Sequence, residues 1–257
     1  MIAGALIFGV PVLADGYESE NHAETEYSYS EEAEIDYSME GQISKPDYYV
    51  AESPDSDTFV DDSTDNTYGY YTIMGKTTVT LEEMVCQFEN QGVAYPSQTM
   101  AEGGAPDISS FCEIILEEAQ LENVRAEIVF EQAILETGWL QFQGVCSPDQ
   151  YNFAGLGATG GDVAGNGFPD VRTGIRAQVQ HLKAYASSQD LNQPCVDSRF
   201  DLVQRESAPY VEWLGIQENP YGGGWAAGKD YGYKLRSLLA QLKGTEYSWP
   251  EQASAGE

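Results

Sequence analysis

The most restrictive feature of this sequence is a change of pattern near residue 70. From Asp15 to Tyr70 the chain repeats acidic, Ser/Thr and Tyr residues without the apolar period of a helix or a strand. Such a segment buries too little apolar surface to offset the conformational entropy lost on folding. We therefore expect residues 15–70 to form a disordered acidic linker or spacer, whose tyrosines could also stack on sugars or on a partner surface.

Beyond Ile73 the apolar residues recur at helical spacing. Thr80 and Glu83 form a capping box, and Gly138 follows a helical stretch in the manner of a left-handed cap. Two helices are expected to start near Thr80 and Asp107, and a third to span Arg125–Thr137. A fourth is expected to start at Thr173, and two more to span Arg199–Glu206 and Asp230–Lys243. These helices predict a mainly α (α+β) domain over residues 71–245, followed by a flexible tail over residues 246–257.

Glycines crowd the segment between Cys146 and Pro169, which reads "NFAGLGATGGDVAGNGFP" at its centre. This density excludes a long helix. It favours a short β-hairpin or a looped lobe, so the expected domain is helical with one small β or irregular lobe.

The first fourteen residues, "MIAGALIFGVPVLA", resemble a secretory signal peptide, although a basic n-region is lacking. The run is too short to cross a bilayer as a helix, so we expect no membrane span in the mature chain. A buried N-terminal strand is the alternative. The signal predicts a secreted or cell-surface protein, which we expect to be a monomer.

Four cysteines fit export, because extracellular proteins keep disulfides. Pairing of Cys86 with Cys112 and of Cys146 with Cys195 closes the shortest loops among three possible connectivities. Four buried free thiols are the alternative.

The composition excludes several kinds of ligand. The formal charge of −30 includes a net −16 from residues 15–70, and no basic stripe is present, so nucleic acid is not expected as a partner. The glycine cluster lacks the Gly-Lys-Ser/Thr of a phosphate loop. His181, one of two histidines, is expected to be a structural residue, and we expect neither a metal nor another cofactor.

The stretch "FEQAILETGWLQ" carries the most informative carboxylate, Glu136. On a helical wheel Glu127 and Glu131 are expected to face solvent, whereas Glu136 lies about 140° from Glu131, on an apolar face with Trp139. Lost hydration raises the pKa of such a carboxyl group and suits it to act as a general acid at a glycosidic oxygen. A frayed surface glutamate at a helix end is the alternative.

Four segments together resemble a known family: "AILETGW", "NFAGLGATGG", "FPDVRTGIRAQVQHLKAYA" and "APYVEWLGIQENPYGGGWAAGKDYGYKLRSLL". They are similar to the bacterial glucosaminidase domain of the mannosyl-glycoprotein endo-β-N-acetylglucosaminidase-like family, glycoside hydrolase family 73. The likeness spans about residues 73–244. It implies a lysozyme-like fold that binds the glycan strands of peptidoglycan between a helical body and a small lobe.

The resemblance also implies roles for individual residues. Glu136 takes the position of the proton donor. Asp170 is the first candidate for the second carboxylate, and Asp162 is the second candidate. Alternatively, Asp170 forms a turn or pairs with Arg172. Tyr231 is expected to act in catalysis, although core packing is an alternative for Tyr231 and Tyr210. Expected substrate contacts are Trp139, Asn152, Phe153, Tyr210 and Trp225.

Three reaction routes remain open at this stage. Carboxyl groups about 5 to 5.5 Å apart suit retention, about 6.5 to 9.5 Å suit inversion, and attack by the substrate's own acetamido oxygen needs no second carboxylate. The expected reaction is cleavage of the β-1,4 bond after N-acetylglucosamine. An N-acetylmuramoyl-L-alanine-type amidase and a catalytically inactive glycan-binding module are the alternatives.

Overall fold

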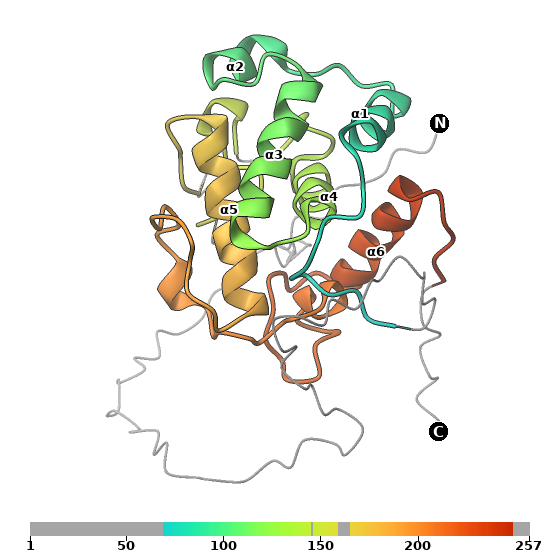
Figure 1. Ribbon diagram of the computed structural model, residues 1–257, viewed down its shortest axis with the longest axis vertical. Coiled ribbons are helices and arrows are strands. Elements are labelled where there is room, and N and C mark those ends of the chain that lie inside the picture. Colours follow the sequence, from blue (N-terminus) through green and yellow to red (C-terminus); the bar gives the residue numbers. More distant parts are fainter. Residues whose placement is uncertain (1–68, 145, 159–164, 249–257) are drawn as a thin grey trace, which may run out of the picture. The chain divides into compact units, whose positions relative to one another are not determined.

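The computed structural model describes residues 69–144, 146–158 and 165–248, and these residues form a mainly helical domain (Figure 1). The predicted fold class is therefore confirmed. The expected signal peptide, the linker up to residue 68, Asp162 and the tail after residue 248 lie outside the described residues. The α-helices are α1 (Leu81–Asn90), α2 (Ser97–Glu102), α3 (Ile108–Glu122), α4 (Ala126–Thr137), α5 (Val171–Ala186) and α6 (Tyr231–Leu242).

Helix α4 is the central element, because α3, α5 and α6 all pack against it. Every one of its residues is buried except Leu135 and Glu136, which are partly exposed. A helix covered on all sides needs no polar face, so the wheel argument that placed Glu127 and Glu131 in solvent is wrong. Both side chains are fully buried. Glu127 accepts hydrogen bonds from the hydroxyl groups of Tyr71 (2.8 Å) and Thr78 (2.9 Å).

The observed helix starts follow local capping chemistry. The predicted capping box of Thr80 and Glu83 is confirmed, and Asp107 caps α3 as expected. The expectation that Thr173 caps α5 is wrong by one turn, because Asp170 accepts a hydrogen bond from the amide of Thr173 at 2.7 Å and the helix begins at Val171. A side-chain oxygen at the N-cap satisfies an amide that the helix itself leaves unpaired.

The lobe between α4 and α5 is irregular. Its described residues contain a 3₁₀ turn, η1 (Pro148–Gln150), and no β-strand. Elsewhere, a 3₁₀ turn, η2 (Phe200–Leu202), replaces the expected helix over residues 199–206, and a second one, η3 (Val211–Leu214), packs against α6. Isolated bridges such as Thr72 with Tyr210 are the β pairing found in the described part of the chain.

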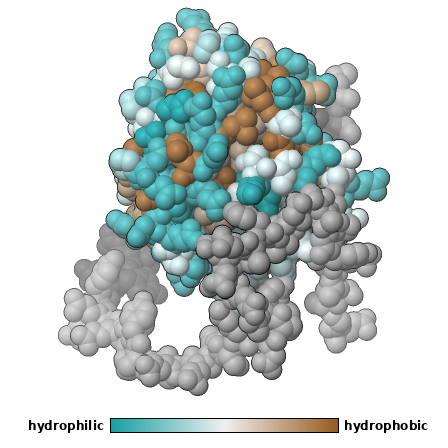
Figure 2. Space-filling model, viewed as in Figure 1, coloured by the Kyte–Doolittle hydropathy of each residue, from teal (hydrophilic) through white to brown (hydrophobic). Residues whose placement is uncertain are grey.

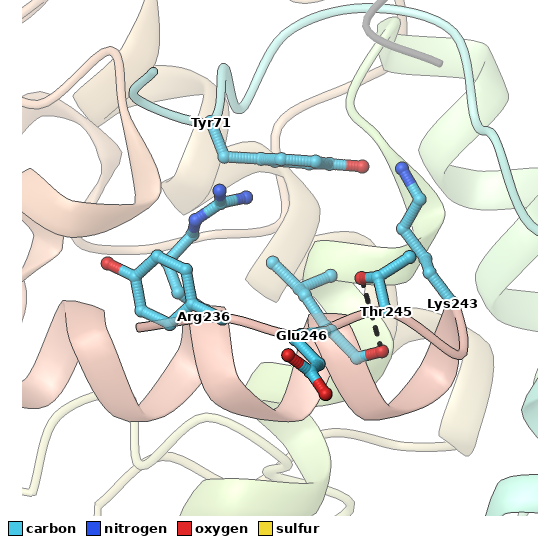
Figure 3. Close-up of a pocket in the computed structure, with 8 residues that line it drawn as sticks. Tyr71, Arg236, Lys243, Thr245 and Glu246 are labelled. Atoms are coloured by element: carbon cyan, nitrogen blue, oxygen red, sulfur yellow. Dashed lines mark hydrogen bonds between the residues drawn. The ribbon is translucent and has the colours of Figure 1, made fainter. Parts of the chain in front are cut away.

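The ring of Tyr71 joins the first described residues to α6 (Figure 3). Arg236 and Lys243 of the α6 region lie 4.8 and 5.3 Å from the ring centroid, and Arg125 lies 5.2 Å from it. Cations over an aromatic face are attracted by its quadrupole. The cavity beside them measures about 10 Å³, which is the space of a single water molecule and too small for a sugar.

The surface in Figure 2 is largely hydrophilic, with separate hydrophobic patches. The large apolar side chains that are exposed come from different elements and are Tyr70, Leu121, Leu202, Ile216 and Tyr221. Among the described residues, no helix is both long and apolar enough to span a membrane.

Candidate active site

Glu136 lies in the last turn of α4, where this otherwise buried helix reaches the surface. Its Oε1 accepts a hydrogen bond of 2.5 Å from the hydroxyl group of Tyr231, the first residue of α6. Tyr231 is itself buried, with 7% of its surface exposed. Because a buried partner holds the carboxyl group, Glu136 is not a frayed glutamate at a helix end.

The surroundings of Glu136 disfavour its negative charge. Burial raises the pKa of its carboxyl group to about 7, although the hydrogen bond from Tyr231 lowers it in part. The C-terminal end of a helix carries partial negative charge, which also disfavours a carboxylate there. A carboxyl group with a pKa near neutral pH can hold a proton and release it during a reaction, as a general acid must.

The chain leaves α4 through a tight left-handed turn. Gly138 has a φ of 58° and Trp139 a φ of 60°, and the amide of Leu140 donates to Thr137 Oγ1 at 2.9 Å. This turn carries the Trp139 ring to 6.4 Å from that of Phe88. Trp139 lines a cleft of about 470 Å³ between α1 and the end of α6, a volume suited to a small ligand. Its contact with a sugar stays a prediction.

The turn from Asn152 to Leu156 faces the acid. Asn152 Nδ2 donates to the carbonyl groups of Leu156 (2.9 Å) and Asn166 (3.0 Å), and its Oδ1 accepts from the amide of Leu156 at 2.9 Å. Phe153 is fully buried. These buried side chains hold the turn in place, and their contact with substrate stays a prediction.

Gly155 is the part of this turn that lies nearest to the acid. Its φ is +64°, a conformation that favours glycine, and a β-carbon at this position would lie 3.9 Å from Glu136 Oε2. Glycine thus lets the turn adopt its shape and leaves the space beside that oxygen free of a side chain.

An aromatic group from α5 and the loop before α6 lies near the same turn. Trp225 packs its ring 4.8 Å from His181 and 5.9 Å from Tyr185, and it contacts the apolar cluster formed by Ala154, Leu156 and Ala177. His181 Nδ1 lies 2.6 Å from Asp197 Oδ2, and this contact fits the structural role expected for His181. Substrate contact by the partly exposed Trp225 stays a prediction.

Asp170 caps α5, as described above, which fits the alternative that it is a turn former. Its role as the second carboxylate stays a prediction. The other alternative, pairing with Arg172, is not observed, because Arg172 binds Glu117 (2.7 Å) and Glu118 (2.9 Å). Asp162, the other candidate for the second carboxylate, is outside the described residues.

Tyr210 lies in a different aromatic group. Its ring centroid is 5.2 Å from that of Tyr70 and 5.0 Å from that of Trp213 in η3. The described contacts do not join Tyr210 to Glu136, so its role in substrate binding stays a prediction.

The predicted disulfides are wrong. Cys86, Cys112 and Cys195 are free thiols, and Cys146 is in no disulfide bond either. Cys112 is buried in α3, whereas Cys86 and Cys195 are exposed, so the alternative of four buried thiols is only partly right. Loop length alone misled the pairing, because it ignores that a disulfide needs its two β-carbons about 4 Å apart.

Sequence reasoning missed two buried glutamines that lie behind the acid. Gln132 Nε2 donates to the hydroxyl oxygen of Tyr231 at 3.1 Å, and Gln178 Nε2 donates to Gln132 Oε1 at 3.0 Å. The available signal was the position of Gln132 on the same helix face as Glu136. The described residues contain no group of three or more His, Cys, Asp or Glu side chains that could hold a metal ion.

Comparison with known proteins places the chain in a family. Residues 112–244, more than half of the chain, match the family model "Glucosaminidase: Mannosyl-glycoprotein endo-beta-N-acetylglucosaminidase". An uncharacterized protein of Borreliella burgdorferi is 40% identical over 135 residues, which cover 52% of this chain and 63% of that relative. The match to the relative thus spans less than two thirds of the relative's length. The residues matched by the family model include Glu136, Gly155 and Tyr231. The chain belongs to the glucosaminidase family.

Proposed function

We propose that this protein is a glycoside hydrolase that cleaves the β-1,4 bond after N-acetylglucosamine in the glycan strands of peptidoglycan. The observation that carries the proposal is Glu136, a partly exposed residue whose carboxyl group has a pKa of about 7 and accepts a hydrogen bond of 2.5 Å from Tyr231, in a chain of the glucosaminidase family. Its elevated pKa suits the protonation of a leaving glycosidic oxygen.

In the proposed reaction, Glu136 donates its proton to the glycosidic oxygen as the bond to C1 breaks. The hydrogen bond from Tyr231 lowers the pKa of Glu136, so it stabilises the carboxylate that remains after the transfer. The same carboxylate can then accept a proton from the water that attacks the sugar, which is how such an acid is regenerated in a two-step reaction.

The positive charge that develops at C1 needs a partner on the other side of the sugar ring. Because Asp170 caps α5, we propose that this partner is either the 2-acetamido oxygen of the substrate or the carboxylate of Asp162. The anomeric form of the first product, observed by proton NMR, separates retention from inversion. Asp162→Asn removes activity if this carboxylate takes part, and leaves it nearly unchanged if the acetamido oxygen acts alone.

The test of the function is digestion of purified peptidoglycan by the full chain, followed by borohydride reduction and mass spectrometry of the fragments. The proposal predicts reduced N-acetylglucosamine at the new ends. Reduced muramic acid would identify a different glycosidase, and new amino termini on the stem peptides would identify an amidase. Binding of peptidoglycan without any cleavage would identify a glycan-binding module.

We also propose that the protein acts outside the cell, because its proposed substrate lies there. The apolar segment of residues 1–14 supports this location. Fractionation of cells that express the full gene, followed by immunodetection, tests the location directly. Recovery of the protein only from the cytosol would contradict it.

A further inference from the structure

Three hydrogen bonds link α5, α4 and α6 in a line that ends at Glu136. Gln178 of α5 donates to Gln132 of α4 (3.0 Å), Gln132 donates to Tyr231 of α6 (3.1 Å), and Tyr231 donates to Glu136 (2.5 Å). Gln132 and Gln178 are fully buried, and Tyr231 is 7% exposed. In this enclosed setting each polar contact is held without competition from bulk water.

The first bonds of the line fix the direction of the others. Gln178 Nε2 donates both to the carbonyl oxygen of Val129 (3.0 Å) and to Gln132 Oε1. A side-chain amide has one oxygen that accepts and one nitrogen that donates. Since Gln132 uses its oxygen toward Gln178, it turns its nitrogen toward Tyr231, and the hydroxyl oxygen of Tyr231 becomes an acceptor. The single hydroxyl proton of Tyr231 is then directed to Glu136 Oε1.

We infer that Gln132 and Gln178 are positioning residues that orient the hydroxyl group of Tyr231, so that Glu136 Oε1 always accepts and Oε2 carries the proton for transfer. This inference rests on the proposed function for its catalytic meaning, and on the hydrogen bonds alone for its geometry. It assigns different tasks to the two oxygens of a single carboxyl group.

The surroundings of Glu136 Oε2 agree with this division. Gly155 lies beside that oxygen, and even an added β-carbon there would be 3.9 Å away. The proton on Oε2 therefore points to a part of the site where no side chain of this turn intervenes. Oε1, by contrast, is covered by the buried Tyr231.

Titration of Glu136 reports whether this line of bonds is intact. The titratable side chain that acts on Glu136 is Tyr231 of α6, and Tyr185 of α5 acts on Tyr231 in turn. Glu136 itself raises the pKa of Cys146 in the lobe. The hydrogen bond from Tyr231 lowers the pKa of Glu136. A variant that leaves the hydroxyl group free to rotate weakens that bond, so it raises the pKa of Glu136.

The test uses Gln132→Met and Gln178→Met, which keep the side-chain length and remove the amide. Gln178 is the milder change, because its Oε1 is buried without a hydrogen-bond partner among the described residues. Gln180→Met is the matched control, since Gln180 is also a fully buried glutamine of α5 but bonds to the carbonyl oxygen of Pro194 instead. The pKa of Glu136 is measured by NMR titration of the full chain with ¹³C-labelled glutamate.

We expect the pKa of Glu136 to rise by about 0.5 to 1 unit in Gln132→Met and in Gln178→Met, and to stay unchanged in the Gln180→Met control. On glycan substrate, kcat should fall by about three- to tenfold with little change in KM, and the high-pH limb of the kcat profile should move upward. An unchanged Glu136 titration in folded Gln132→Met and Gln178→Met would overturn the inference. If Gln132→Met does not fold, the Gln178→Met result decides.

The titration separates the two proposals. If the pKa of Glu136 shifts but the wild-type chain cuts no glycan, the positioning role stands and the proposed function fails. If the wild-type chain cuts glycan and the pKa does not shift, the function stands and the positioning role fails. A loss of thermal stability that is equal in all three variants, with no shift, would show that the glutamines only support the fold.

Discussion

Replacing Glu131 by Gln is expected to change how the stability of this protein depends on pH. Glu131 lies in the central helix α4 with no exposed surface, and neither of its carboxyl oxygens has a hydrogen-bond partner among the described residues. Burial raises the pKa of its carboxyl group from the ordinary value of 4.5 to about 8, and the nearby Gln87 side chain offsets this only in part. The group is therefore uncharged in the folded protein at neutral pH.

The size of the effect follows from this difference. In the unfolded chain Glu131 loses its proton as the pH passes about 4.5, whereas in the folded chain it keeps the proton up to about pH 8. Its contribution to stability is fully present below pH 4.5 and is lost at about 1.4 kcal/mol per pH unit as the pH rises toward 8. The total is about 5 kcal/mol across that range. Glutamine does not titrate, so the variant lacks this loss.

Urea denaturation at pH 5, 6, 7 and 8 measures the change. The amide of Glu131→Gln has its own packing and hydrogen-bonding cost, but that cost is constant with pH and does not alter the slope. We expect the free energy of unfolding of the variant, relative to wild type, to increase steadily from pH 5 to pH 8. Glu113→Gln, at an exposed position of α3, is the control and should run parallel to wild type. Parallel curves for Glu131→Gln and wild type would show that the pKa of Glu131 does not change on folding.

Three further predictions follow from the site and its surroundings. Tyr231→Phe removes the donor to the acid, so we expect the high-pH limb of activity to move up by about one unit and kcat to fall about tenfold or more, in a pH-rate profile. Asn152→Ala removes three hydrogen bonds to the backbone, two to Leu156 of the turn and one to Asn166, which should lower the free energy of unfolding by about 2 kcal/mol in urea titrations, and an unchanged midpoint would argue against this role. In the absence of a reducing agent, a thiol reagent should modify Cys86 and Cys195 in the native protein but reach Cys112 only after unfolding. Protection of all three cysteines from the reagent would restore the disulfide hypothesis.

Local signals predicted the helices well because the physics that forms them is local. The capping box at Thr80 and the left-handed cap at Gly138 depend on residues within one turn, and both were predicted from the sequence. The start of α5 was misplaced because Asp170 and Thr173 are both good caps, and only the observed hydrogen bond chooses between them.

The burial of α4 could not be predicted from its own sequence. A wheel for this helix shows glutamates on more than one face, and only packing by three other helices explains why Glu127 and Glu131 are covered. The same limit applies to the site. Glu136 and Tyr231 were both proposed from motifs, but their hydrogen bond joins residues 95 positions apart and depends on how α4 meets α6.

The residues that support Glu136 could not be predicted from the sequence for a related reason. Gln132 and Gln178 carry no motif that distinguishes them from other buried glutamines, such as Gln180. Asn152 and Phe153 were predicted from a motif as substrate contacts, and the structure adds a role that the motif did not reveal, because both side chains are buried and Asn152 bonds to the backbone of the turn. A motif identifies which residues matter at a site, whereas three-dimensional contacts show whether they touch the ligand or hold the fold.

The proposed role of Glu136 as the general acid is tested most directly by the release of new reducing ends from purified peptidoglycan by wild-type protein and by Glu136→Gln. Glutamine keeps the shape of the side chain and can still accept the hydrogen bond from Tyr231, but it has no proton to donate to the glycosidic oxygen. We predict that the wild type releases N-acetylglucosamine ends, and that the folded variant does so about 10² to 10⁴-fold more slowly, as expected when an essential general acid is lost. Release by the variant at a rate close to that of wild type would contradict it.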